Sequence, residues 1–246
     1  MVEFGLIGKK LSHSFSKDYF SKKFMKLGLS NYTYELFPLA DISQLTNLIK
    51  DHSELKGLNV TIPYKQEILP YLNSVDPTAE AVGAVNVVKI ERGELIGYNS
   101  DFLGFKQSLE QWLPGKHKFK ALILGTGGAS KAVAAALQSM DIPFQYVSRT
   151  NSATAISYNT LKLNSDYIKG FNLIINTTPL GMSPNTEEYP DIPYSELTAN
   201  HFLYDLIYNP EETQFLLHGK TMGCNTKNGL EMLHIQAEKS WEIWNS

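Results

Sequence analysis

A lysine at the end of one polar stretch, Lys65, has the setting of a proton-transfer group. In residues 57–65, Asn59 and Thr61 alternate with apolar residues, which is the pattern of a strand. Pro63 suits the first turn of a following helix, which would place Lys65 near the positive end of the helix dipole. An ammonium is disfavoured there, so such a lysine can serve as a general acid or base. The alternative is an ordinary solvated surface lysine.

A glycine-rich turn is the second feature with chemical meaning. The apolar run Ala121–Leu124 has the length of a buried parallel strand, Gly125–Gly128 interrupt it, and an alanine-rich helix begins near Ala129. Strand, glycine turn and helix in this order typically open a dinucleotide-binding unit, because the helix N-terminus attracts phosphate. Ser130 replaces the third glycine of the usual motif, and a purely structural turn is the alternative.

The residue after the next strand bears on the choice of nucleotide. NAD-binding proteins usually carry a carboxylate there for the ribose hydroxyls, whereas this chain has Arg149 between Ser148 and Thr150. A guanidinium matches the oxygens of a 2′-phosphate. Together with the glycine turn, Arg149 predicts NADP rather than NAD, and the alternative is a surface arginine.

Alternating serines near the N-terminus allow two interpretations. Ser12, Ser14 and Ser16 precede a helical stretch predicted over residues 17–27. A single serine suffices to cap a helix, but alternate residues of an extended segment share a face and could bind a polyhydroxy or carboxylate ligand.

Composition indicates an ordinary globular protein. The 246 residues fit one large or two modest domains, and 43% of them are hydrophobic. A net charge of −3 argues against nucleic acid as a partner. No apolar run approaches a membrane span, no signal peptide is evident, and Cys224 is the single cysteine, so we expect a cytoplasmic protein. The scattered histidines predict no metal site.

The elements that must position these groups suggest an α/β protein of two domains. Asn99-Ser100-Asp101 precedes a connecting helix over 102–112, so the boundary falls near residue 101, and either Ser100 or Asp101 could simply cap that helix. The expected strands cover 2–7, 32–37, 58–62, 84–90, 94–98, 121–124, 144–147, 171–175 and 202–207. A final helix has the apolar stripe Leu230, Leu233, Ala237, Trp241 and Trp244.

With these residues in view, the chain resembles the shikimate dehydrogenase family over nearly its whole length, and the motifs occur in the family's order. They are Ser14-x-Ser16, Asn59-Val-Thr61-x-Pro-x-Lys65, Gly83-Ala-x-Asn86, Asn99-Ser-Asp101, Gly125-x-Gly-Gly-Ala129, Ser148-Arg149-Thr150, Asn176-x-Thr-Pro-x-Gly-Met182, Asp205-x-x-Tyr208 and Gly229-x-x-Met-Leu-x-x-Gln236.

The resemblance implies NADPH-dependent reduction of 3-dehydroshikimate to shikimate in a cleft between two domains. The substrate domain would comprise residues 1–101 and 226–246, and a Rossmann-type domain would comprise 102–225. Lys65 and Asp101 would form the catalytic pair, with the proton assigned to neither member alone. The implied substrate-binding residues are Ser14, Ser16, Asn59, Thr61, Lys65, Asn86, Asp101, Tyr208 and Gln236. The implied cofactor-binding residues are Gly125, Thr126, Gly127, Gly128, Ala129, Ser148, Arg149, Thr150, Leu206 and Gly229.

The chain departs from the family pattern around the arginine. The family often has asparagine at the position of Ser148, and a second basic residue where this chain has Asn151-Ser152-Ala153-Thr154. The preference for NADP over NAD is therefore expected to be weaker than is usual in the family. Two alternatives remain: an NAD-using quinate/shikimate dehydrogenase, and a ligand-sensing protein without turnover. The sequence leaves open whether the chain is a monomer or a homodimer.

Overall fold

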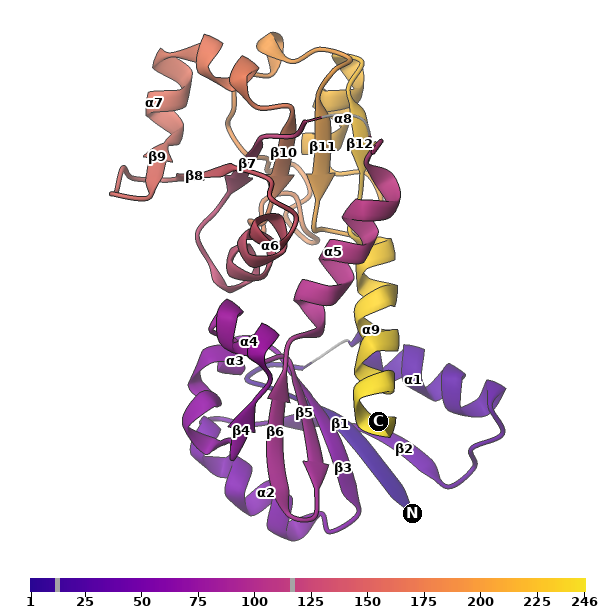
Figure 1. The fold of residues 1–246 in the computed structure, drawn as a ribbon. Helices are drawn as coiled ribbons and strands as arrows, with labels where there is room; N and C mark the ends of the chain where they lie inside the picture. Colours follow the sequence, from indigo (N-terminus) through magenta and orange to yellow (C-terminus); the bar gives the residue numbers. More distant parts are fainter. Residues whose placement is uncertain (12–13, 116–117) are drawn as a thin grey trace. The chain divides into compact units, whose positions relative to one another are not determined.

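The computed structural model describes residues 1–11, 14–115 and 118–246. These residues divide into two compact units, here called unit 1 (Met1–Leu103 with Gln236–Ser246) and unit 2 (Gly104–Ile235). Each unit contains its own sheet with helices, so the α/β class predicted from the sequence is confirmed (Figure 1). No helix of the described chain is both long and apolar enough to cross a membrane.

Unit 1 contains a mixed sheet with the strand order β2-β1-β3-β5-β6-β4. β1 pairs in parallel with β2 and β3, and β5 pairs antiparallel with β3 and β6. The strands are β1 Val2–Gly8, β2 Tyr32–Pro38, β3 Leu55–Val60, β4 Ser74–Val75, β5 Val87–Glu91 and β6 Glu94–Tyr98. Arg92 and Gly93 turn the β5–β6 hairpin with positive φ angles of 53° and 83°.

Helices cover both faces of this sheet because alternate residues of its strands point to opposite sides. Phe4 and Leu6 join an aromatic core with α1 and α9, whereas Ile7 joins a second core with α2 and α3 (Figure 1). The helices of unit 1 are α1 Phe15–Lys26, η1 Ile42–Gln44, α2 Leu45–Asp51, α3 Tyr64–Glu67, η2 Leu69–Tyr71 and α4 Pro77–Val82. Two longer helices, α5 Ser100–Trp112 and α9 Leu230–Asn245, each contribute residues to both units.

Unit 2 contains a parallel sheet with the order β12-β11-β10-β7-β8-β9. Its strands are β7 Ala121–Leu124, β8 Phe144–Ser148, β9 Ala155–Ser157, β10 Leu173–Asn176, β11 Phe202–Asp205 and β12 Asn225–Lys227. Its remaining helices are α6 Gly128–Ser139, α7 Tyr158–Leu163, η3 Ser165–Gly170, η4 Tyr194–Glu196 and α8 Gln214–Thr221. The strand order reverses at β7, and ligands of such sheets bind beyond the carboxyl ends of the strands at that point.

Several predicted boundaries are wrong in ways that matter for the site. Helix α1 begins at Phe15, so Ser16 is helical rather than part of an extended segment, and Ser12 lies outside the described residues. Strand β3 ends at Val60, two residues earlier than predicted. In the final helix the predicted apolar stripe includes Leu230, which is exposed.

Two further predicted boundaries shift around the lysine and the connecting helix. Asn86 precedes β5 instead of lying inside it. The helix after Pro63 has only four residues, which is too short for the dipole argument that singled out Lys65. The predicted connecting helix starts at Ser100, and Asn99 accepts a hydrogen bond from the Phe102 amide, so neither Ser100 nor Asp101 is its cap.

Candidate active site

The catalytic pair implied by the family resemblance is in direct contact. Lys65 lies in α3 and Asp101 in the first turn of α5, and Lys65 Nζ donates a hydrogen bond of 2.6 Å to Asp101 Oδ2. The side chains are 25% and 18% exposed, so a small molecule can reach them. The two side chains therefore form a partly exposed ion pair.

A chain of buried amides and hydroxyls lies in the same unit. Asn86 Oδ1 accepts from the Ser100 amide at 2.7 Å, and Asn86 Nδ2 donates to Ser100 Oγ at 3.0 Å. Ser100 Oγ in turn donates to Gln236 Oε1 at 3.3 Å and lies 3.2 Å from Ser240 Oγ. Asn59 Nδ2 donates to Ser240 Oγ at 3.0 Å. Three predicted substrate residues, Asn59, Asn86 and Gln236, are therefore linked through two serines.

The tyrosine Tyr34 of β2 extends this chain on its far side. Its hydroxyl donates to Asn59 Oδ1 at 2.7 Å and is also hydrogen-bonded to Ser16. Burial raises the pKa of Tyr34 far above the usual tyrosine value, although the Ser16 bond opposes this. Ser16 thus belongs to the network even though it is helical. Ser14 caps α1 by accepting a hydrogen bond from the Lys17 amide at 3.4 Å. Helix capping was one of the two interpretations of the alternating serines, and ligand binding was the other.

Thr61, another predicted substrate-binding residue, directly follows the last residue of β3. A β-carbon built on Gly8 would come within 2.6 Å of Thr61 Cγ2, so the backbone of β1 closes tightly on this side chain. The amide of Thr61 donates to the Ile7 carbonyl at 2.9 Å, which fixes the turn leading to Lys65.

Three members of the network were not among the site residues predicted from the sequence: Tyr34, Ser100 and Ser240. Ser240 lies four residues after Gln236 on α9, and its hydroxyl donates to the Gln236 carbonyl at 2.9 Å. The helical period places both on one face, so the position of Gln236 was a usable signal for Ser240. Tyr34 gives no such signal, because tyrosine is common in strands for packing reasons alone.

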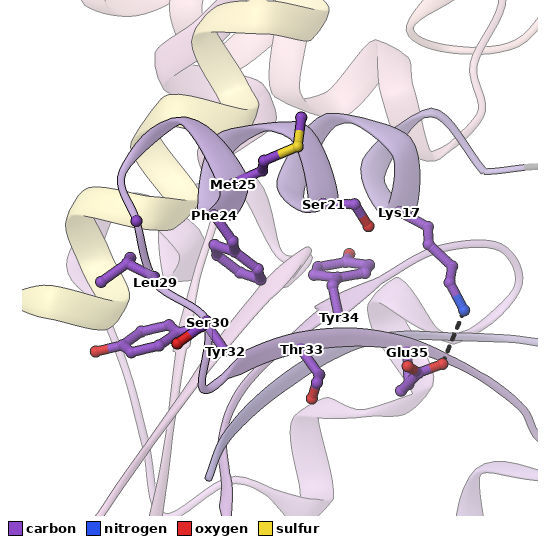
Figure 2. Close-up of a pocket in the computed structure, with 11 residues that line it drawn as sticks. Lys17, Ser21, Phe24, Met25, Leu29, Ser30, Tyr32, Thr33, Tyr34 and Glu35 are labelled. Carbon is purple, nitrogen blue, oxygen red and sulfur yellow. Dashed lines mark hydrogen bonds and ion pairs between the residues drawn. The ribbon is translucent and has the colours of Figure 1, made fainter.

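A groove of about 480 Å³ lies between α1 and β2, and Tyr34 is the member of the network that lines it. Figure 2 shows Phe24 and Tyr34 between the helix and the strand, with the Lys17–Glu35 ion pair of 2.8 Å at one end. Among the residues described, none of the predicted substrate residues lines this groove. Tyr34 therefore presents its ring to the groove and its hydroxyl to Asn59.

In unit 2, a cavity of about 480 Å³ lies where the strand order reverses. Five predicted cofactor residues line it: Gly125, Thr126, Gly127, Ser148 and Arg149. The opposite wall comes from the loop after β10, residues Thr177–Leu180, together with Tyr158. This loop carries the family motif Asn176-x-Thr-Pro-x-Gly-Met182, and it follows the carboxyl end of a strand, where loops of such sheets line a cofactor crevice.

The glycine turn has the features that a phosphate site needs. Gly125 has a φ of +108°, and a β-carbon there would lie 2.8 Å from Thr177 Oγ1. Gly127 and Gly128 face open space, and the twelve-residue helix α6 starts without a side-chain cap. Its first amides, including that of Ala129, are therefore available to an anion. Ser130, in place of the third glycine, turns its hydroxyl onto the Gly127 carbonyl at 2.6 Å.

The segment after β8 presents Arg149 to solvent at the rim of the cavity. Ser148 Oγ donates to the Thr150 carbonyl and accepts from the Thr150 amide at 3.3 Å, so these two residues form the turn that displays Arg149. The residues present thus fit a dinucleotide with an additional phosphate, because the guanidinium of Arg149 offers the cation that such a phosphate requires.

Leu206 and Gly229, the two other predicted cofactor residues, are in close contact. A β-carbon on Gly229 would lie 2.1 Å from the Leu206 carbonyl oxygen, and the Gly229 amide donates to the Ile207 carbonyl at 3.0 Å. Only glycine allows this approach. Tyr208 follows on the same segment in unit 2 and is 40% exposed.

Among the residues that the structure describes, no group of three histidine, cysteine, aspartate or glutamate side chains is arranged to hold a metal ion.

Comparisons with known proteins identify relatives over the whole chain. The family model for the shikimate dehydrogenase substrate-binding domain matches residues 6–88. A shikimate dehydrogenase (NADP(+)) from Methanococcus maripaludis is 39% identical over 256 residues, covering 98% of this chain and 90% of that protein.

Solved structures give the same result. A crystal structure of shikimate dehydrogenase 1 from Peptoclostridium difficile is 40% identical, with a TM-score of 0.86, and covers 100% of this chain and 92% of that one. A quinate dehydrogenase from Corynebacterium glutamicum in complex with NAD shares the fold with a TM-score of 0.88, but only 27% of its residues are identical over 99% of this chain and 93% of that one.

Proposed function

This chain belongs to the shikimate dehydrogenase family, and we propose that it catalyses the NADPH-dependent, reversible reduction of 3-dehydroshikimate to shikimate. One observation carries the assignment of the reacting groups: Lys65 and Asp101 form an ion pair in the unit that also contains the Asn59–Asn86–Gln236 network. The family's fold of a substrate domain and a Rossmann-type domain is present.

The reaction requires a hydride for the ketone carbon and a proton for its oxygen. NADPH, when bound, supplies the hydride. The Lys65 ammonium stabilises negative charge on the oxygen and gives up a proton to it, and Asp101 orients the ammonium and takes part in the proton exchange. In the oxidative direction the same pair accepts the proton of the hydroxyl group.

The substrate is a ring carboxylate with several hydroxyl groups, which matches the amide and hydroxyl side chains of the network. We assign its binding to the residues predicted from the sequence: Ser14, Ser16, Asn59, Thr61, Lys65, Asn86, Asp101, Tyr208 and Gln236. Amides can donate and accept at once, so they suit hydroxyl groups that do the same. Ser14 would bind through the hydroxyl that caps α1 in this structure.

NADP is assigned to unit 2. The glycine turn Gly125–Gly128 with Ala129 would hold the pyrophosphate, Ser148–Thr150 the 2′-phosphate, and Leu206 with Gly229 the nicotinamide side. The cavity between the glycine turn and Arg149 and the uncapped start of α6 support this assignment.

The proposal also covers the domain bounds, the cellular location and the oligomeric state. The substrate domain is assigned to residues 1–101 and 226–246 and the cofactor domain to 102–225. We assign the protein to the cytoplasm, as a monomer or homodimer without a nucleic-acid partner or metal. The buried, unbridged Cys224 and the net charge of −3 support this.

A steady-state assay tests the function directly. Initial rates are measured with shikimate or quinate and with NADP⁺ or NAD⁺, in four combinations. We expect shikimate with NADP⁺ to give the highest kcat/KM. A higher kcat/KM with quinate and NAD⁺ would instead identify an NAD-using quinate dehydrogenase, and no turnover in any combination would identify a sensing protein.

The Arg149→Gln variant tests the nucleotide assignment. Removing a charge-assisted contact worth about 1.5–3 kcal/mol should lower kcat/KM for NADP⁺ by about 10- to 100-fold and leave NAD⁺ unchanged. Arg92→Gln, at the tip of the β5–β6 hairpin, removes the same charge from unit 1 and serves as the matched control.

A further inference from the structure

Asp205, at the end of β11, has a fully buried carboxylate for which the proposed mechanism has no use. It accepts hydrogen bonds from three segments of unit 2. Oδ1 accepts from Asn176 Nδ2 and from the Ile207 amide, both at 3.0 Å, and Oδ2 accepts from Thr213 Oγ1 at 2.6 Å. A buried carboxylate with this many donors from separate segments fixes their relative positions.

On one side, the bonds continue through Asn176 into the wall of the nucleotide cavity. Asn176 Oδ1 accepts from the Thr178 amide at 3.0 Å and from Thr178 Oγ1 at 2.7 Å. Asn176 Nδ2 also approaches the Leu180 carbonyl at 3.4 Å. Both Thr178 and Leu180 line the cavity, whereas Asn176 itself is fully buried behind them.

On the other side, the bonds fix the segment after β11. The Ile207 amide binds the Asp205 carboxylate, and the Ile207 carbonyl accepts from Gly229. The Leu206 amide donates to the Asn176 carbonyl at 3.0 Å, so the two strand ends are also joined through the backbone. Leu206 and Gly229 are the residues assigned to the nicotinamide side.

We propose that Asp205 and Asn176 form a positioning pair that holds the loop after β10 and the segment after β11 at a fixed separation, and thereby sets the affinity for NADP without touching it. This inference rests on the proposed assignment of the cavity to NADP. The two residues act through Thr178 and Leu180 on one side and through Leu206 and Ile207 on the other.

The energetics favour a positioning role over a stabilising one. Burial raises the pKa of Asp205 to about 6, against the opposing effect of its three hydrogen bonds. Tyr194 lies near enough that the Asp205 charge contributes to raising the pKa of this tyrosine. A buried carboxylate without a cationic partner lowers the stability of the fold. The benefit of Asp205 therefore lies in the segments that its hydrogen bonds hold in place.

The test measures NADP⁺ binding by calorimetric titration, together with KM for both substrates. Asn176→Ala removes the bonds to the cavity loop but leaves Asp205 with Ile207 and Thr213. We expect its Kd for NADP⁺ and its KM for NADP⁺ to rise by about tenfold, with KM for shikimate within twofold of wild type. Asp205→Ala should have at least the same effect.

Asp205→Asn is the conservative variant that should restore binding. Its amide oxygen can still accept from Asn176 and Ile207, and its amide nitrogen can donate to the Thr213 hydroxyl, so Kd should stay within threefold of wild type. Ser108→Ala is the control for lost buried bonds, because Ser108 is fully buried and bonds Tyr204 and Glu231, neither of which is assigned to NADP or bonded to Asp205 or Asn176 through its side chain. It should leave Kd unchanged.

A second readout uses the wild-type protein and does not depend on the folding of a variant. Amide hydrogen exchange should slow at both Thr178 and Ile207 when NADP⁺ is added, since the pair links the two segments. If Arg149→Gln leaves Kd unchanged, the assignment of the cavity is wrong. If Arg149→Gln weakens binding while Asn176→Ala and Asp205→Ala bind like wild type, or if only one of the two amides slows, the positioning pair is refuted.

Discussion

Lys65 Nζ lies 2.6 Å from Asp101 Oδ2, although 36 positions of the chain separate the two residues. The contact joins the short helix α3 to the first turn of α5. Tyr64, next to the lysine in the sequence, is buried in one core of unit 1, and Phe102, next to the aspartate, is also buried. The pair is therefore placed by packing before any substrate arrives.

Replacing Lys65 with methionine keeps the bulk of the side chain and removes the proton-transfer group. We expect kcat to fall by about 10²-fold or more, the usual size of a general acid–base contribution. The free energy of unfolding should change little, because the pair is partly exposed and such pairs contribute about 0–1 kcal/mol. Initial rates and urea unfolding of the purified variant measure both quantities.

Lys17→Met is the matched control for this experiment. Lys17 forms an ion pair of 2.8 Å with Glu35 in the same unit, at the groove between α1 and β2. The substitution removes an equal charge and should leave kcat within twofold of wild type. Turnover of Lys65→Met within a few-fold of wild type would exclude Lys65 as the proton-transfer residue.

Tyr34→Phe should weaken substrate binding from a distance. The hydroxyl of Tyr34 donates to Asn59 Oδ1, and its loss leaves a buried amide oxygen without that donor. Such a loss costs about 1–3 kcal/mol and frees Asn59 to rotate. We expect KM for shikimate to rise by about five- to tenfold, with KM for NADP⁺ unchanged.

Tyr194→Phe provides the comparison, since it removes a tyrosine hydroxyl bonded to the Pro190 carbonyl at 2.8 Å in unit 2. Its KM for shikimate should equal that of wild type. An unchanged KM in Tyr34→Phe would show that Asn59 does not bind the substrate or does not need this tyrosine.

Gly229→Ala tests the close backbone approach at the nicotinamide side. The new β-carbon would lie 2.1 Å from the Leu206 carbonyl oxygen, so the segment after β11 must move. Overpacking of this kind typically costs about 1–3 kcal/mol, and here it displaces residues assigned to the cofactor. We expect a lower melting temperature and a rise of about tenfold or more in KM for NADP⁺.

Gly170→Ala is the control, because a β-carbon there meets no atom within 4 Å. It lies in unit 2 as well, at the end of η3. Wild-type values of Tm and KM in Gly229→Ala would show that the backbone relaxes freely and that this contact does not position the cofactor segment.

The pH dependence of stability should reveal the buried Asp205 carboxyl. Its pKa is raised from 3.8 to about 6, so between these values the native state binds a proton that the unfolded chain has lost. The free energy of unfolding therefore falls as the pH rises through this window. The loss is complete above about pH 7 and is on the order of 3 kcal/mol.

Asp205→Asn cannot titrate and should lack this loss. Urea unfolding of both proteins at about pH 4 and about pH 7.5 measures the difference, and the other ionisable groups are common to both. We expect the variant to gain stability relative to wild type on going from acid to neutral pH. A difference that is the same at both pH values would mean that the carboxyl titrates normally.

The features that sequence predicts well are those with local causes. The glycine turn follows from an apolar run, a break and an alanine-rich segment, and β7 and α6 lie where this pattern places them. Arg149 was predicted from its position after one strand end, and it lines the cavity of unit 2. The residues Asn59, Asn86 and Gln236 were predicted from an ordered set of motifs, and the structure links their side chains.

The features that sequence missed depend on tertiary contacts. Ser16 was read as part of an extended segment, yet α1 begins one residue earlier, and its partner Tyr34 comes from β2. The helical dipole invoked for Lys65 does not exist in a four-residue helix, and the contact with Asp101 takes its place. Packing between distant segments determines both the Ser16–Tyr34 contact and the Lys65–Asp101 contact. No local sequence pattern encodes such packing.

The last residues of the chain complete the unit that contains the first ones. Trp244 stacks on Phe4 with ring centroids 4.6 Å apart and donates from Nε1 to the Val88 carbonyl at 3.0 Å. Ser240 closes the bond to Asn59, and a β-carbon on Gly57 would overlap the Trp244 ring at 2.3 Å.

This arrangement sets an order of events during translation. Domains usually fold as they leave the ribosome, N-terminal first. Here the N-terminal strands emerge early, whereas Ser240 and Trp244 emerge only after all of unit 2. The residues of unit 2, Gly104–Ile235, are contiguous, so its core is synthesised before α9 is complete. The nascent sheet of unit 1 therefore keeps an open aromatic face until α9 has been synthesised.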